Sequence, residues 1–100
     1  MYEKVLQQMR AAAAVRRVYL VIHANRELKN DRLTYEDVIH CILTGEIIEL
    51  QIDLEYADEK YVLYGDACND DEMAVIAKLG YNDAAVVITV YRLTITDYDF

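Results

Sequence analysis

The hydrophobic pattern of the sequence changes period at Gly45, and this change constrains the fold more than any other feature. Over residues 34–45 the apolar side chains recur three to four residues apart, which is the spacing of a helix. Directly after Gly45, residues 46–53 alternate apolar and polar side chains, which is typical of a strand with one buried face. The chain is therefore predicted to combine helices with a sheet.

The segment 34–45 also carries a signal at each end. Thr34 can cap the helix, and Asp37, three residues later, can return a hydrogen bond to the cap residue, as in a capping box. Gly45 follows the last apolar residue of the helix, where we expect a backbone with positive φ. The predicted apolar face of this helix consists of Val38, Ile39, Ile42 and Leu43.

Local composition predicts the remaining elements. Residues 2–14 are rich in strong helix formers and predict a first helix, and residues 23–31 predict a short second one. Between them, residues 16–22 are largely β-branched or aromatic and predict a strand. Further strands are expected over residues 60–65, 72–79 and 84–93.

In chain order these elements predict an α+β domain: an N-terminal helix, a strand, two short helices and then a four-stranded antiparallel meander. Both faces of the last strand, 84–93, are largely apolar, so we expect it near the centre of the sheet with helices on one side. A chain of 100 residues with short connections is expected to form a single domain. We divide it into a helix at 1–15, a core at 16–93 and an acidic tail at 94–100.

Charge is distributed unevenly along the chain. The formal net charge is −8, from 10 basic and 18 acidic residues, and seven of the basic residues lie within residues 1–32. An acidic surface repels phosphate backbones, so generic nucleic-acid binding is disfavoured, although a local basic patch in residues 1–32 leaves RNA binding open. A basic protein partner suits the acidic part better, and the alternative is that the acids simply solvate the surface.

Several protein classes are not favoured by the sequence. No apolar run approaches the roughly 18 residues of a membrane span, and the N-terminus does not have the pattern of a signal peptide. Cys41 and Cys68 form no CxxC pair and do not suggest a disulfide framework. We therefore expect a cytoplasmic protein without a membrane partner and without a cofactor.

Three motifs together resemble a known family. They are HAxxELxxDxLTxxDV from His23, ILTGEI from Ile42 and ITVY from Ile88. The ordered set, which falls within residues 16–93, resembles small uncharacterised bacterial proteins that are common in cyanobacteria and are recorded as a domain of unknown function. That family is thought to be akin to BrnT, RelE and MqsR-type toxins. The resemblance therefore implies a RelE/BrnT-like fold, a toxin–antitoxin-type module and an antitoxin-like protein partner.

The same resemblance implies where a site would lie. RelE-like nucleases cleave RNA without metal, using Lys, Arg and Tyr side chains on the sheet. Lys60, Lys78 and Arg92 are the only cations after residue 32, and we expect them to converge on one sheet face with Tyr64 and Tyr91. Lys60, Lys78, Arg92 and Tyr91 would then contact the phosphate or act as the acid. The alternative is that each cation simply pairs with a nearby carboxylate.

His23, Glu27 and Asp31 are spaced four residues apart and would share one face of a helix. His23, oriented by a carboxylate, could act as the general base of an RNase. The three side chains could instead hold a divalent metal, or His23 could simply bond to Glu27 while Asp31 ends the helix. Many relatives carry arginines in a pattern like HAxxRxxxR, and here those positions are Glu27 and Asp31. Because a carboxylate cannot grip phosphate, this departure weighs against an RNase.

A second hypothesis is a non-catalytic interaction domain. The chain has nine tyrosines with one phenylalanine and no tryptophan, and tyrosine-rich surfaces suit protein interfaces. Such a domain would bind a basic partner or a second copy of itself. The predicted helix at 2–14 lies outside the family-like core, which makes it a candidate for the contact in a homodimer.

Overall fold

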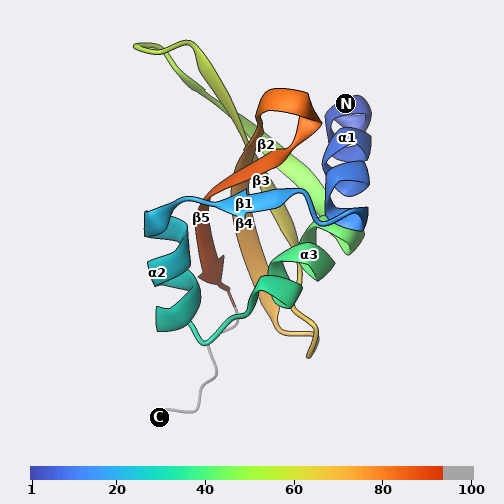
Figure 1. The fold of residues 1–100 in the computed structure, drawn as a ribbon, viewed down its shortest axis with the longest axis vertical. Coiled ribbons are helices and arrows are strands. Elements are labelled where there is room, and N and C mark those ends of the chain that lie inside the picture. Colours follow the sequence, from blue (N-terminus) through green and yellow to red (C-terminus); the bar gives the residue numbers. More distant parts are fainter. Residues whose placement is uncertain (94–100) are drawn as a thin grey trace.

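The computed structural model describes residues 1–93, so the predicted acidic tail at 94–100 lies outside the described residues. Within this range the chain forms an α+β fold of three helices, one short 3-10 helix (η1) and five strands (Figure 1). The elements are α1 (Glu3–Ala14), β1 (Val18–Leu20), α2 (Ile22–Asn30), α3 (Tyr35–Thr44), β2 (Glu46–Asp53), β3 (Asp58–Asp66), β4 (Glu72–Leu79), η1 (Tyr81–Asp83) and β5 (Ala85–Arg92).

The strands form one mixed sheet with the order β1-β5-β4-β3-β2. Strands β2, β3, β4 and β5 pair antiparallel with their neighbours, whereas β1 pairs parallel with β5, with Val18 opposite Ala85 and Leu20 opposite Val87. The predicted four-stranded antiparallel sheet is therefore corrected to a five-stranded mixed sheet. The strand predicted over 16–22 shortens to three residues, because Ile22 already begins α2.

The position of β5 agrees with the prediction in part, because β5 is an interior strand next to the central one. Strand β4, not β5, is central, and β5 is flanked on both sides by strands only where β1 pairs with Ala85–Val87. Beyond Val87, helix α2 lies along the outer edge of β5 (Figure 1). The apolar faces of this strand are therefore covered by strands in its first half and by a helix in its second.

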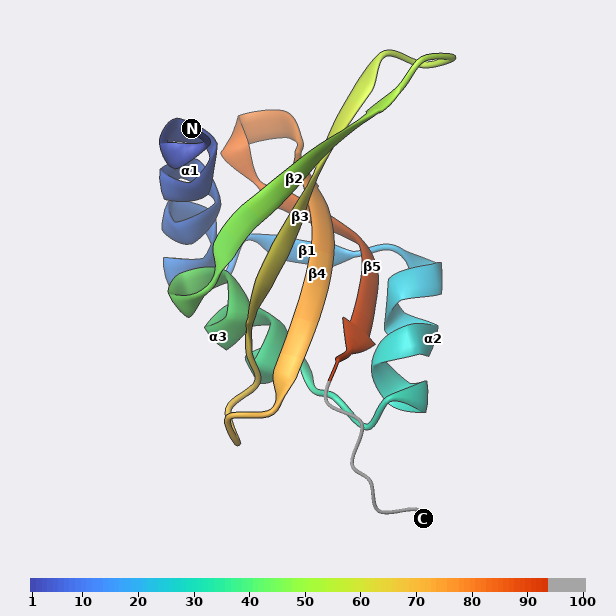
Figure 2. The same ribbon diagram turned by 180° about the vertical axis from the view of Figure 1, so that it is seen from behind.

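Helices α1 and α3 cover one face of the sheet, and no helix within residues 1–93 covers the opposite face of β2, β3 and β4 (Figure 2). Met9 of α1, Ile42 of α3 and Leu63 of β3 are fully buried in the core between these layers. Arg10 of α1 also donates to the carbonyl of Gly45 at 2.7 Å. The apolar face of α1 is thus filled within its own chain, and the helix does not offer that face as a dimer contact.

The capping box predicted for α3 is present. The Asp37 N–H donates to Thr34 Oγ1 and the Thr34 N–H donates to Asp37 Oδ2 at 2.8 Å, so the side chain of each residue accepts a hydrogen bond from the backbone of the other. The prediction for Gly45 is wrong, because its φ is −87°. Glycine is needed there for close packing instead: an added Cβ would lie 2.5 Å from the Tyr64 carbonyl oxygen.

No helix in the described range, residues 1–93, has both the length and the apolar character needed to cross a membrane.

Candidate functional site

Most of the side chains that could bind a ligand or take part in a reaction lie on the uncovered face of the sheet. Tyr64 of β3 and Tyr91 of β5 both lie opposite Ala74 of β4, so the two rings flank this fully buried alanine. Alternation along each strand places the side chains two residues away on the same face. We call this surface the tyrosine face; it comprises Glu49, Lys60, Val62, Tyr64, Ala74, Ile76, Lys78 and Tyr91.

The electrostatics of this face keep Tyr91 protonated. Burial raises the pKa of the Tyr91 phenol above its ordinary value, and neighbouring Tyr64 and Glu49 raise it further. At neutral pH the phenol is therefore a neutral O–H donor. This is the protonation state needed for a general acid, and equally for a hydrogen bond across a protein interface.

A hollow lies beside Tyr64, at the edge of the tyrosine face. Its walls include three carboxylates, from Glu46, Asp66 and Glu72, together with the apolar side chains of Ile48 and Leu93. Carboxylates around an apolar floor match a lysine or arginine, whose aliphatic stem and cationic head need both kinds of contact. The hollow therefore combines negative charge with apolar surface.

Lys60 and Lys78 lie at the other end of the tyrosine face. Tyr61 and Ala77 are paired on the antiparallel strands β3 and β4; Lys60 precedes Tyr61 and Lys78 follows Ala77, so the two lysines stand side by side. Four residues separate Lys60 from Tyr64, which corresponds to about 13 Å along an extended strand. Lys78 is already paired, because its Nζ lies 3.0 Å from Asp58 Oδ2. The lysines and tyrosines share a face, but they occupy opposite ends of it.

Arg92 does not join them, contrary to the prediction. Tyr91 and Arg92 lie opposite Ala74 and Met73 respectively, so they point to opposite faces. The physical reason is that successive residues of a strand alternate between the two faces, so Tyr91 and Arg92 cannot share a face in any register. The irregularity where Ile76 and Ala77 pair with β5 decides which of the two lies on the face of the lysines; without it, Arg92 would replace Tyr91 there.

The guanidinium of Arg92 is fully used in holding the fold together. Its Nε and Nη2 donate to the Asp31 carbonyl at 3.2 and 3.0 Å, and Nη2 also lies 3.3 Å from the Arg32 carbonyl. Its Nη1 forms an ion pair with Asp71. These contacts fasten the end of α2 and the β3–β4 turn to the end of β5, so Arg92 serves as a structural residue in this conformation.

Glu27 and Asp31 also have a structural use that the sequence did not indicate. Glu27 Oε1 accepts from the Val90 N–H at 3.0 Å, and Asp31 Oδ2 accepts from the Arg92 N–H at 2.9 Å. Residues four apart on a helix rise by about 6.0 Å, which nearly matches the roughly 6.7 Å between every second residue of a strand. The two carboxylates therefore satisfy successive free N–H groups along the edge of β5.

His23 stands at the exposed end of the same helix. Its Nε2 lies 3.3 Å from Glu27 Oε2, which is the contact expected if the pair is merely structural. The structure does not bring His23 to the tyrosine face, because α2 lies at the edge of the sheet beyond β5 (Figure 1). Nor do His23, Glu27 and Asp31 form a metal site: no group of three or more His, Cys, Asp or Glu side chains between residues 1 and 93 is placed to hold an ion.

The two cysteines are poor nucleophiles. Cys41 is fully buried, and burial, with a smaller contribution from Asp66, raises the pKa of its thiol to about 12. Cys68 is exposed, but partial desolvation and the nearby carboxylates of Asp37 and Glu36 raise the pKa of its thiol as well. Neither forms a thiolate at neutral pH, so we assign no covalent chemistry to them.

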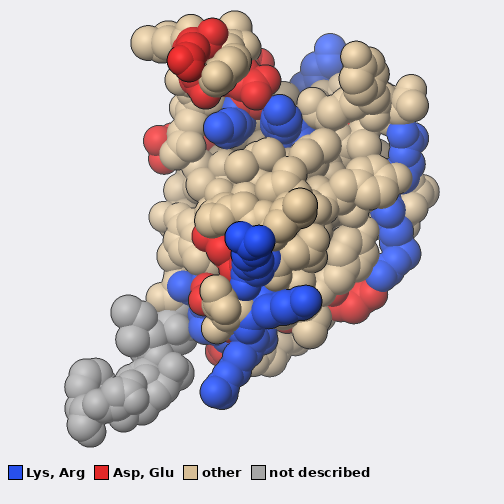
Figure 3. Space-filling view, turned by 60° about the vertical axis from the view of Figure 1, so that its left-hand side comes forward, with Lys and Arg blue, Asp and Glu red and all other residues tan. Residues whose placement is uncertain are grey.

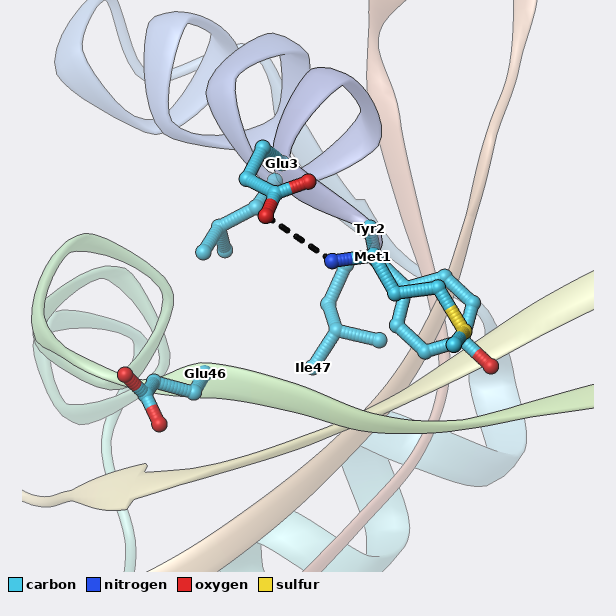
Figure 4. Close-up of a pocket in the computed structure, with 6 residues that line it drawn as sticks. Met1, Tyr2, Glu3, Glu46 and Ile47 are labelled. Carbon is cyan, nitrogen blue, oxygen red and sulfur yellow. Dashed lines mark hydrogen bonds and ion pairs between the residues drawn. The ribbon is translucent and has the colours of Figure 1, made fainter.

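A further shallow pocket lies between the start of α1 and the start of β2. Figure 4 shows Glu46 pointing away from Glu3, so the two carboxylates do not share a site. The Tyr2 ring, at the same end of α1, packs edge-on against Tyr61 of β3 with centroids 6.0 Å apart. These contacts seat α1 on the sheet and leave no reactive group between them.

Comparison with known proteins agrees with the motifs in the sequence. No match to the chain is found among curated proteins or among solved structures. A family model described as "Domain of unknown function (DUF4258)" matches residues 22–92, which include α2, α3 and strands β2 to β5. Because this match covers more than half of the chain, the protein belongs to that family of uncharacterised domains.

Proposed function

We propose that this chain is a protein-binding member of a bacterial toxin–antitoxin-type module, and that it holds a basic partner protein on its tyrosine face. The observation that carries the proposal is the hollow beside Tyr64, which Glu46 and Asp66 line together with the apolar residue Ile48. A partner would insert a lysine or arginine there and pack apolar side chains against Tyr64 and Tyr91. The antiparallel strands β2 to β5, packed on α1 and α3, support a RelE/BrnT/MqsR-like fold for the module.

The state of the candidate catalytic groups favours binding over RNA cleavage. A metal-independent nuclease needs cations that are free to meet the phosphate in its transition state. Here Arg92 is committed to backbone carbonyls and Asp71, and Lys78 is paired with Asp58. Two further positions where relatives carry arginine hold Glu27 and Asp31, whose oxygens face strand N–H groups.

Retention of a partner from a native lysate tests the proposal. We expect a basic protein to remain on the immobilised chain at low salt and to dissociate as salt screens the acidic hollow. Tyr64→Lys should abolish retention, because it places a positive charge beside the carboxylates that would bind the partner's basic side chain. Tyr19→Lys is the matched control, because Tyr19 is an exposed tyrosine on the edge strand β1, which β5 and β4 separate from Tyr64. Equal retention by both variants would refute the assignment of the face.

A metal-independent endoribonuclease is the second candidate, and one observation favours it: Lys60 and Lys78 stand side by side on the same face as Tyr91. The lysines would contact the phosphate and Tyr91 would supply the proton. Controlled induction of the chain in bacteria distinguishes the candidates. Growth arrest that Lys60→Ala relieves would support cleavage, whereas normal growth together with partner retention supports binding.

A further inference from the structure

The hairpin that joins β2 to β3 projects beyond the body of the molecule (Figures 1 and 2). Its tip, residues 52–57, exposes Ile52, Leu54 and Tyr56, and Leu54 is 92 % exposed. Asp53 Oδ1 accepts from the N–H groups of Glu55 and Tyr56 at 2.9 and 3.3 Å, which fixes the turn. An ordered turn that holds apolar side chains in water is a typical contact for another protein.

Acidic side chains surround these apolar ones. Asp53 and Glu55 lie in the tip itself, and Figure 3 shows acidic atoms gathered there, with basic atoms just below them over the body of the molecule. The tip therefore presents a leucine next to negative charge. Its occupant must provide an apolar hollow with positive charge at its rim.

This chain contains such a hollow at the base of the same hairpin. The base hollow lies between β3, β4 and η1, and Leu79, Gly80, Tyr81 and Val86 form its apolar part. Tyr81 is 95 % exposed, so one wall consists of a ring that faces solvent. Lys78 lines the hollow together with Asp58, with which it is paired, and Lys60 stands next to Lys78, so two lysines and one carboxylate meet at this place.

We infer that the protein forms a two-fold homodimer in which the hairpin tip of each copy docks into the base hollow of the other. Leu54 fills the space between Leu79, Tyr81 and Val86, and Glu55 meets Lys60 across the interface. Tip and hollow are complementary in both polarity and charge, and they belong to one chain, so a two-fold axis satisfies both copies and closes the assembly. This contact is separate from the hollow beside Tyr64 and does not depend on the proposed function.

Sedimentation equilibrium of the full chain over a range of concentrations tests the dimer. We expect Leu54→Asp to raise the dimer dissociation constant by about a hundredfold, because the apolar contact is lost twice per dimer. Ile22→Asp is the matched control: Ile22 is also a highly exposed aliphatic residue, 73 % accessible, but it lies on α2. A wild-type chain that stays monomeric at every concentration, or a Leu54→Asp variant that dimerises like wild type, would overturn the inference.

Charge reversal provides a second test, in which each of two variants replaces one charged residue with a residue of opposite charge. Glu55→Lys and Lys60→Glu should each weaken self-association, because each homodimer then opposes like charges at both contacts. An equimolar mixture of the two variants should restore dimers, since each tip then faces a base of opposite charge. Failure of the mixture to associate better than its components would refute the pairing, even if the Leu54 variant proved unfolded by circular dichroism.

Discussion

Replacement of Arg92 distinguishes a structural from a catalytic role most directly. The side chain is 23 % exposed and makes contacts with the Asp31 and Arg32 carbonyls and with Asp71. Hydrogen bonds from a charged donor contribute about 1.5–3 kcal/mol when buried, and a partly exposed ion pair adds about 1 kcal/mol or less. We therefore expect Arg92→Ala to lower the free energy of unfolding by about 2–4 kcal/mol.

Urea denaturation followed by circular dichroism measures this change. Arg26→Ala is the control, because Arg26 is an exposed arginine of α2 whose side chain makes no hydrogen bond or ion pair within residues 1–93, and its loss should change stability by no more than about 0.5 kcal/mol. Arg92→Lys keeps the positive charge but not the planar guanidinium with its several donors. It should therefore recover less than half of the free energy of unfolding that Arg92→Ala loses. An Arg92→Ala variant as stable as wild type would refute the structural role and return Arg92 to the list of candidate catalytic residues.

Four other outcomes follow from the contacts described. Gly45→Ala should destabilise the fold by at least about 2 kcal/mol in the same assay, because the new methyl group meets backbone that cannot move aside. Thr34→Ala should cost about 1 kcal/mol through loss of the α3 cap. Burial opposes ionisation of Asp37, but bonds from the N–H groups of Cys68 and Thr34 outweigh it and lower its pKa below 3.8. Ionised Asp37 should thus contribute fully to the free energy of unfolding above the ordinary pKa, and this contribution should disappear as the pH falls through the lower pKa of the folded state. Asp37→Asn should therefore reduce the loss of stability at acidic pH. Finally, ultraviolet titration should show raised pKa values for Tyr61 and Tyr91, and Glu49→Gln should lower the pKa of Tyr91 alone.

Features that depend on neighbouring residues could be predicted from the sequence. The bounds of β2 and β4 agree with the predicted strands over 46–53 and 72–79, and the capping box of Thr34 is present. Each depends on side-chain alternation or on a pair of residues three apart, so the information is local. The α+β class follows from the order of these elements.

Features that depend on pairing between distant strands could not be predicted. The bulge opposite Ile76 and Ala77 shifts the alternation of β5, and no local pattern marks it. It places Tyr91 rather than Arg92 on the face of the lysines. A cluster that contains both Tyr91 and Arg92 is excluded by the alternation of neighbouring strand residues alone. The hollow beside Tyr64 was missed for a similar reason, because it combines residues from β2, β3 and β4.

The carboxylates that line the edge of β5 have a consequence for the solution behaviour of the protein. A sheet edge with free N–H groups is a template on which chains polymerise into fibrils. Glu27 and Asp31 satisfy Val90 and Arg92 without themselves presenting a new edge, because they are side chains of a helix. Replacing both residues with alanine would therefore leave the N–H groups at the edge of β5 without acceptors. The first observable effect would be aggregates that bind thioflavin, rather than a loss of binding activity.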